Sequence, residues 1–189
     1  TMLYAVVMVI VVALLLALVS SGLKSKQTQN VELDRKKQIL SSLQIDMNGK
    51  NPAELYDKII VKELVVNNKA EIISENKGDA FALDVLKETT KKLENRKLPV
   101  YIANIDGKTK YIVPVRGAGL WGPIWGFVAL DDDKNTVFGT FFAHASETPG
   151  LGAEISTPQF QGEFVGKHIL NDKEEFVSII YRAGVEEDF

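Results

Sequence analysis

The 189-residue sequence contains no cysteine and few residues that commonly carry out catalysis. Without cysteine, the chain forms no disulfide, offers no thiol nucleophile and binds no cysteine-ligated metal. His144 and His168, the two histidines, are too few for a histidine-rich zinc site. The net charge is −3 and the basic residues are scattered, so we expect no nucleic-acid partner.

Common enzyme motifs are also missing. The sequence has no Gly-x-Ser-x-Gly elbow, no P-loop and no Gly-x-Gly-x-x-Gly loop that opens a helix. Arg116-Gly-Ala-Gly begins like a dinucleotide loop, but the tryptophans and Pro123 that follow argue against a phosphate-binding helix there. His144 is a conceivable general base without an evident partner, and residues 131–133 indicate a solvated acidic turn rather than a cation loop. We therefore expect no catalytic residue and no metal.

A long apolar run opens the chain. Residues 2–19 are apolar, and residues 1–23 include no charged side chain. At about 1.5 Å per residue, a helix of this length spans a hydrocarbon core of roughly 30 Å. Residues 20–22 could serve as a signal-peptide cleavage site, but the apolar run exceeds the length of a signal peptide. We expect a transmembrane anchor over 1–23, a polar stalk over 24–32 and one domain over 33–189.

The charges beside this run do not settle its orientation. Lys24, Lys26 and the cluster 35–37 would place the domain in the cytoplasm by the positive-inside rule. Long domains translocate despite such charges, and the upstream flank is needed for a comparison. Because the sequence begins with Thr1, we expect it to be a piece of a longer chain.

The rest of the sequence predicts an α+β domain with helices first and an antiparallel sheet later. Helices are expected over 31–45, from Asn51-Pro52 onward, from an Asp79 cap through Phe81, Val85, Thr89 and Leu93, and over 157–165. Strands are expected over 59–66, 100–105, 111–115, 125–130, 137–143 and 176–181. Asp106-Gly107 predicts a hairpin turn between the second and third of these strands.

Two glycine-dense loops stand out in this pattern. The first, 116–126, contains both tryptophans, and the second, 147–152, reads Glu-Thr-Pro-Gly-Leu-Gly. Glycine allows close backbone approach, and aromatic rings offer a flat face to a planar cofactor. The alternative is that both loops are ordinary turns between strands.

The segments 113–130 and 147–154 resemble the FMN-binding domain found in the C subunit of sodium-translocating NADH:quinone reductases. The resemblance implies a membrane-anchored subunit whose FMN relays electrons between redox centres of neighbouring subunits, with no NADH or quinone site of its own. It implies a bacterial inner membrane, a periplasmic domain, and the lipid bilayer and other redox subunits as partners. The alternatives are the equivalent G subunit of the ferredoxin:NAD complex and a tethered assembly module without a redox role.

The resemblance also implies the cofactor contacts. Leu151 would face the isoalloxazine ring, Glu147 and Thr148 would offer polar contacts, and the loop 119–122 would form the neighbouring wall. The implied cofactor-binding residues are Gly119, Leu120, Trp121, Gly122, Glu147, Thr148, Gly150, Leu151 and Gly152. In this family a threonine of a Ser-Gly-Ala-Thr motif carries the FMN, and this motif is absent from the sequence. We expect the attachment threonine beyond residue 189.

Overall fold

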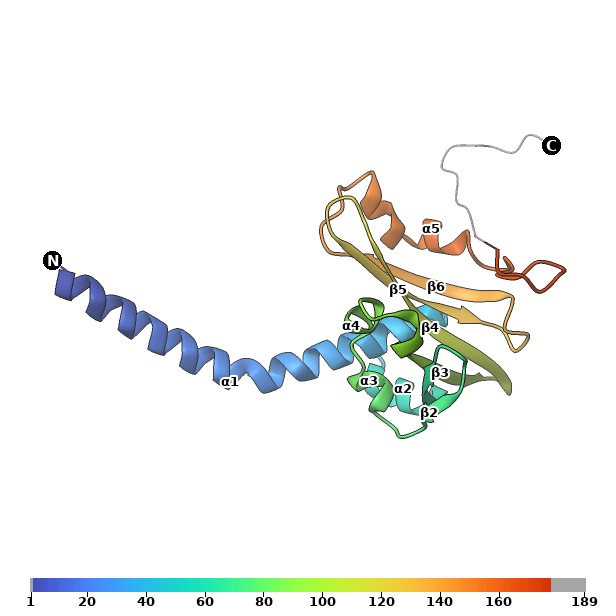
Figure 1. Cartoon of the computed structure of the whole chain (residues 1–189), viewed down its shortest axis with the longest axis horizontal. Helices are drawn as coiled ribbons and strands as arrows, with labels where there is room; N and C mark the ends of the chain where they lie inside the picture. Colours follow the sequence, from blue (N-terminus) through green and yellow to red (C-terminus); the bar gives the residue numbers. More distant parts are fainter. Residues whose placement is uncertain (1, 178–189) are drawn as a thin grey trace. The chain divides into compact units, whose positions relative to one another are not determined.

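The computed structural model describes residues 2–177 of the chain (Figure 1). Its contacts divide the chain into two compact units, Thr1–Arg35 and Lys36–Phe189. The division falls within helix α1, Met2–Ser42, which is 41 residues long. Each unit is described separately below.

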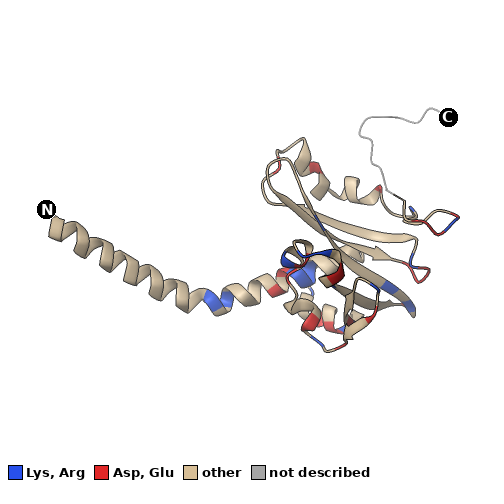
Figure 2. Cartoon of the chain, viewed as in Figure 1, with Lys and Arg blue, Asp and Glu red and all other residues tan. Residues whose placement is uncertain are grey.

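The first unit consists of the long apolar part of α1. Its most apolar 18-residue window has a mean hydropathy of 3.1 and buries none of its residues within the protein. Length and composition make this the one helix among residues 2–177 that could cross a membrane. Figure 2 shows no charged residue on this helix until the blue band of Lys24 and Lys26. The polar residues 24–32 are helical as well, since α1 runs through them without a break.

The second unit is built on an antiparallel six-stranded sheet with the strand order β2-β1-β3-β4-β5-β6. The strands are β1 (Ile60–Asn67), β2 (Ile72–Ser74), β3 (Lys97–Ile105), β4 (Lys108–Ala118), β5 (Pro123–Leu130) and β6 (Val137–His144). The sheet is antiparallel and has helices before, between and after its strands, so the α+β class with an antiparallel sheet and flanking helices is confirmed. The sequence reasoning missed the short edge strand β2.

Local signals account for several of these elements. Asn51 caps α2 (Pro52–Ile59), and its side-chain oxygen accepts the N–H of Ala53 at 3.0 Å, as predicted. Asp106 and Gly107 join β3 to β4 with φ angles of 50° and 82°. Positive φ at both positions is typical of the two-residue hairpin turn that the sequence predicts.

One face of the sheet carries the hydrophobic core. The last turns of α1 contribute Ile39 and Leu40, both with 0% exposure, and β4 contributes Ile112, also at 0%. A row of edge-on aromatic rings crosses this core, with centroids 5.4, 5.8 and 6.3 Å apart. The row is Tyr56, Phe81, Tyr101 and Phe127. Helices and sheet are thus held together mainly by apolar burial.

The opposite face of the sheet is covered at β6 by a second layer. The 3-10 helix η2 (Gly152–Ser156) and the helix α5 (Pro158–Gly162) both pack on β6, and Figure 1 shows α5 lying along it. Thr157 caps α5 through its side-chain oxygen, which accepts the N–H of Phe160 at 3.3 Å. The helix predicted over 157–165 is therefore present but shorter.

The structure overturns the prediction of one helix capped by Asp79. The segment forms α3 (Asp79–Ala82), α4 (Val85–Thr89) and the 3-10 turn η1 (Leu93–Asn95). Leu83 is extended (φ −73°, ψ 123°), and the Asp84 side chain then accepts the N–H groups of a new first turn. Gly78 precedes α3 in the left-handed region, so Asp79 lies inside the helix rather than at its cap.

The predicted last strand lies partly outside the described residues. Phe176 forms an isolated antiparallel bridge with Leu170, and Val177 donates its N–H to the carbonyl of Ile169 at 2.8 Å. Residues 178–181, the remainder of that prediction, are not among those described.

Candidate functional site

The two glycine-dense loops lie side by side. The loop 119–122 joins β4 to β5 and closes on itself, with the Gly119 N–H donating to the carbonyl of Gly122 at 2.8 Å. The loop 145–151 leaves β6 and leads into η2. Because β5 and β6 are paired neighbours, the sheet brings both loops to the same end.

The second loop holds the backbone of Trp121 on both sides. The Ser146 hydroxyl donates to the Trp121 carbonyl at 2.7 Å. The Glu147 carboxylate accepts the Trp121 N–H at Oε1, at 2.9 Å. The Ala145 N–H adds a bond of 3.1 Å to the carbonyl of Pro123. These contacts make the two loops one structural element.

The Glu147 loop has a compact local geometry. The N–H groups of Leu151 and Ala153 both donate to the carbonyl of Thr148 at 3.1 Å. Gly150 has φ +73°, a conformation that favours glycine, and its N–H donates to Oε1 of Glu154 at 3.1 Å. Glu154, in η2, thus holds the backbone of this loop.

Large apolar side chains project from the joined loops into solvent. Leu120, Trp121 and Leu151 are 82%, 66% and 72% exposed. Glu147 is only 8% exposed. A wall for a planar ring requires exposed apolar groups on a rigid backbone, and this arrangement supplies both.

An apolar pocket adjoins these loops. Its volume is about 310 Å³, near the lower end of the range for ligand sites. Gly117, near the end of β4, and Ile155, in η2, both line it. The first loop follows β4 and the second precedes η2, so the pocket adjoins both loops. The full lining is Val115, Arg116, Gly117, Ile124, Trp125, Phe142, Ile155, Phe160 and Phe164.

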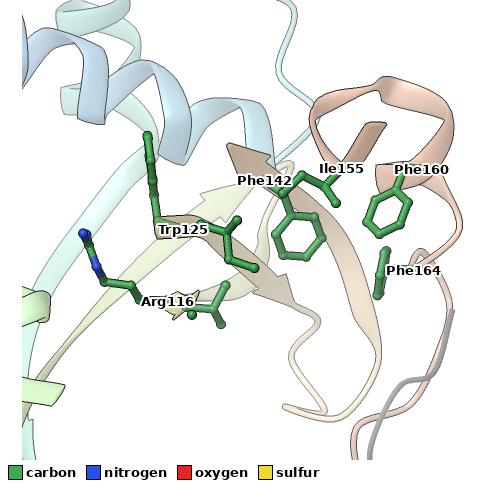
Figure 3. A pocket seen from close by; sticks show the side chains of 9 residues that line it. Arg116, Trp125, Phe142, Ile155, Phe160 and Phe164 are labelled. Carbon is green, nitrogen blue, oxygen red and sulfur yellow. The ribbon is translucent and has the colours of Figure 1, made fainter. Parts of the chain in front are cut away.

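Three phenylalanine rings form one side of this pocket. Phe142 lies 6.2 Å from Phe160 and 5.3 Å from Phe164, centroid to centroid, and the latter two are 5.3 Å apart. Figure 3 shows these rings and Ile155 facing one another, whereas the side chains of Arg116 and Trp125 point away from them.

Gly126 makes the close packing beside Phe142 possible. A Cβ at Gly126 would lie 2.1 Å from the carbonyl oxygen of Phe141 and 2.7 Å from the Phe142 ring. Real Cβ atoms do not approach so closely, so only glycine fits. Trp125 turns the other way, and its indole N–H donates to Oε1 of Gln38 at 3.3 Å.

The sequence reasoning missed Ser146 and the phenylalanine cluster. Phe160 and Phe164 stand at helical spacing just after the Thr157-Pro158 helix start, which would have placed them on one face. Their contact with Phe142 depends on how α5 packs on β6, which no local signal predicts.

The two histidines and the acidic turn 131–133 were the other candidates considered from the sequence. His144 accepts the Glu147 N–H at Nδ1, at 3.1 Å, and His168 is exposed and bridges to Thr136. Within residues 2–177, no group of three or more His, Cys, Asp or Glu could hold a metal ion. The turn 131–133 is only partly solvated, because Asp131 is paired with the buried Lys110.

Comparison with known proteins matches the region that contains the two loops. The family model described as "FMN-binding domain" matches residues 119–183, a range that begins at Gly119 and includes both loops. The C subunit of the Na(+)-translocating NADH-quinone reductase of Pseudomonas aeruginosa is 32% identical, covering 98% of this chain and 78% of its own length. The corresponding C subunit of Vibrio anguillarum is 30% identical, covering 97% of this chain and 77% of its own.

Solved structures show the same fold. A crystal structure of the C subunit of this reductase from Parabacteroides distasonis has a TM-score of 0.75 and 45% identity, covering 82% of this chain and 74% of that one. The fold, the loops and the apolar helix together define an FMN-binding-type domain on a helix able to cross a membrane. More particularly, the chain belongs to the family formed by the C subunits of the Na(+)-translocating NADH-quinone reductases.

Proposed function

We propose that this chain is the membrane-anchored FMN subunit of a sodium-pumping NADH:quinone reductase. The observation that carries the proposal is the meeting of the two loops beside an apolar pocket, within the range matched to the FMN-binding domain. The relatives are named as the C subunit of this reductase, which favours it over the ferredoxin:NAD complex.

The residues of the site suit a flavin ring. Leu151, Leu120 and Trp121 are exposed, and each can cover part of a flat aromatic surface. The phenylalanine-lined pocket offers an apolar seat beside them. When bound, FMN supplies the ability to accept and release electrons one at a time, while the protein binds and orients it. Thr148 and Gly150 would contribute polar or close backbone contacts.

The remaining parts of the proposal concern attachment, partners and placement. We infer that FMN is joined to a threonine of a Ser-Gly-Ala-Thr motif, which the sequence of residues 1–189 does not contain. Residues 1–23 would anchor the chain in the bacterial inner membrane, 24–32 would lead away from the bilayer, and 33–189 would form a periplasmic domain. The other membrane and redox subunits would supply the electron donor and acceptor.

Flavin fluorescence in a denaturing gel tests the proposal. The protein is expressed from its complete gene together with a flavin transferase, and a fluorescent band at its mass is expected. A dark band despite active transferase would overturn the redox role and favour a tethered assembly module. Purification of the native complex then identifies the partner subunits.

A further inference from the structure

Glu147 is a buried acid on an otherwise exposed surface. Its exposure is 8%, whereas Leu120, Trp121 and Leu151 of the same two loops are at least 66% exposed. A carboxylate removed from water needs hydrogen-bond donors, because desolvation of a charge is costly. The Trp121 N–H is such a donor, 2.9 Å from Oε1.

Two glycines form a slot around this carboxylate. A Cβ on Gly119 would lie 2.2 Å from Oε1, and a Cβ on Gly152 would lie 2.6 Å from Oε2. Neither glycine has a positive φ, so backbone conformation does not require glycine at these positions. A side chain at either glycine would therefore displace the Glu147 carboxylate, and at Gly119 it would also meet the carbonyl oxygen of Gly122 at 2.9 Å.

The slot accounts for one glycine in each of the two loops. One of its glycines comes from each loop, and the carboxylate between them is bound to the backbone of the first. The Glu147 side chain thus connects the two loops from inside, in addition to the Ser146 bond to the Trp121 carbonyl. Each of the loops joined in this way also carries an exposed apolar side chain, Trp121 on the first and Leu151 on the second.

We propose that Glu147 is a positioning residue of the cofactor site. It holds the loop of Trp121 against the segment from residue 145 to Gly152, and it does not touch the flavin. The proposal rests on the proposed function, and it replaces the direct polar contact to the flavin expected from the resemblance. A direct contact would require an exposed carboxylate, and that of Glu147 is enclosed by Gly119, Gly152 and the Trp121 amide.

Amide hydrogen exchange at Trp121 tests the connection without any flavin. The full chain in detergent, labelled with ¹⁵N only at tryptophan, gives two backbone amide signals, from Trp121 and Trp125. Trp125 lies within β5, between two paired strands, and reports whether the sheet is intact. In Glu147→Ala, exchange at Trp121 should accelerate about ten-fold or more, as expected for a lost bond to a charged acceptor, with Trp125 unchanged.

Three further variants sharpen this test. Glu147→Gln keeps an acceptor oxygen and should retain part of the protection. Gly152→Ala should accelerate exchange at Trp121 although Glu147 is intact, because the new methyl displaces the carboxylate. Glu163→Ala removes an exposed carboxylate just after α5, outside both loops, and should leave Trp121 unchanged. Unchanged Trp121 exchange in both Glu147→Ala and Gly152→Ala would overturn the proposal.

A second readout uses the flavin itself. In the loaded protein, iodide should quench the flavin fluorescence more strongly in Glu147→Ala than in the wild type, with Glu147→Gln between them. A change in flavin emission in Glu147→Gln without a change in Trp121 exchange would mean direct contact and would also overturn the proposal. Absence of flavin from the wild type would refute the proposed function, whereas the exchange experiment would still decide whether Glu147 holds the loops.

Discussion

Gly139 in β6 lies directly against the carbonyl oxygen of Ser42 at the end of α1. A Cβ on Gly139 would be 2.4 Å from that oxygen, and both residues are buried. The neighbouring Gln44 adds a bond from its side-chain amide to the carbonyl of Phe138 at 2.9 Å. The strand and the end of the helix therefore meet through backbone atoms, which cannot move aside as a side chain could.

Gly139→Ala should destabilise the domain by about 1–3 kcal/mol, the typical cost of overpacking a well-filled interior. Denaturant unfolding of the full chain in detergent measures this. Gly162→Ala, in α5, is the matched control, since a Cβ there meets nothing within 4 Å. Equal stability of the two variants would show that β6 and the end of α1 separate easily.

Contacts of this kind mark the limit of what the sequence can predict. The Asn51 cap and the Asp106-Gly107 turn depend on adjacent residues, and both were predictable. The helical periodicity from Phe81 to Leu93 was misleading, because the extended Leu83 and the Asp84 cap outweigh it. The helical periodicity favoured one continuous helix and the Asp84 cap favoured a new helix start, and the structure has the new helix start.

The candidate site divides in the same way. Both loops could be located from glycine density and the resemblance. The slot that holds Glu147 could not, because Gly119 lies in the preceding loop and only the β5–β6 pairing brings it near. The phenylalanine pocket likewise depends on the packing of α5 against β6. Residues distant in sequence thus determine both features.

The hydrogen bond between Tyr56 and Glu63 should contribute to the stability of the domain. The Tyr56 hydroxyl donates to Oε1 of the buried Glu63 at 2.9 Å, and burial together with this carboxylate raises the pKa of Tyr56 far above its ordinary value. Tyr56→Phe should cost about 1–3 kcal/mol, because the buried Glu63 carboxylate loses the Tyr56 donor and retains the Gly78 N–H. Denaturant unfolding measures it, and Tyr111→Phe on the half-buried face of β4 should cost less.

We expect the two partners of the Lys110–Asp131 ion pair to differ in how much stability is lost when each is replaced. The Lys110 side chain is 6% exposed and lies 4.1 Å from the centre of the Phe138 ring, whereas Asp131 is 30% exposed. Asp131→Asn leaves a buried ammonium without its counter-ion and should cost about 3 kcal/mol or more. Lys110→Met leaves a carboxylate that water can reach, and should cost clearly less. Thermal unfolding of the two variants compares them, and the reverse order would contradict the assigned burial.

Leu151 offers a test of where the proposed cofactor binds. Because its side chain is 72% exposed, Leu151→Ala should change stability by no more than about 0.5 kcal/mol. If Leu151 covers the flavin, the same change should increase quenching of the flavin fluorescence by iodide. Leu93→Ala, at a position 66% exposed in η1, is the control and should leave quenching unchanged. Equal quenching in both variants would place the flavin away from Leu151.

Glu88 predicts how stability depends on pH. Its carboxylate accepts the Lys91 ammonium at 2.7 Å and the backbone N–H of Lys97 at 3.0 Å. These bonds, with that of Lys91 first, lower the pKa of Glu88 below its ordinary 4.5. A carboxyl with a lower pKa in the folded state stabilises the protein above its unfolded pKa, and this contribution disappears as the pH falls through the folded value.

Glu88→Gln should therefore reduce stability near neutral pH and make the loss of stability on acidification less steep. Denaturant unfolding of the full chain at intervals from about pH 7 to about pH 3 covers the titration of the carboxyls. The wild type and the variant should converge at the acid end, since the protonated carboxyl and the amide are both neutral. Glu94→Gln, at an exposed position in η1, should follow the wild-type curve. A constant offset between wild type and Glu88→Gln across the whole range would mean that Glu88 acts through packing rather than through its charge.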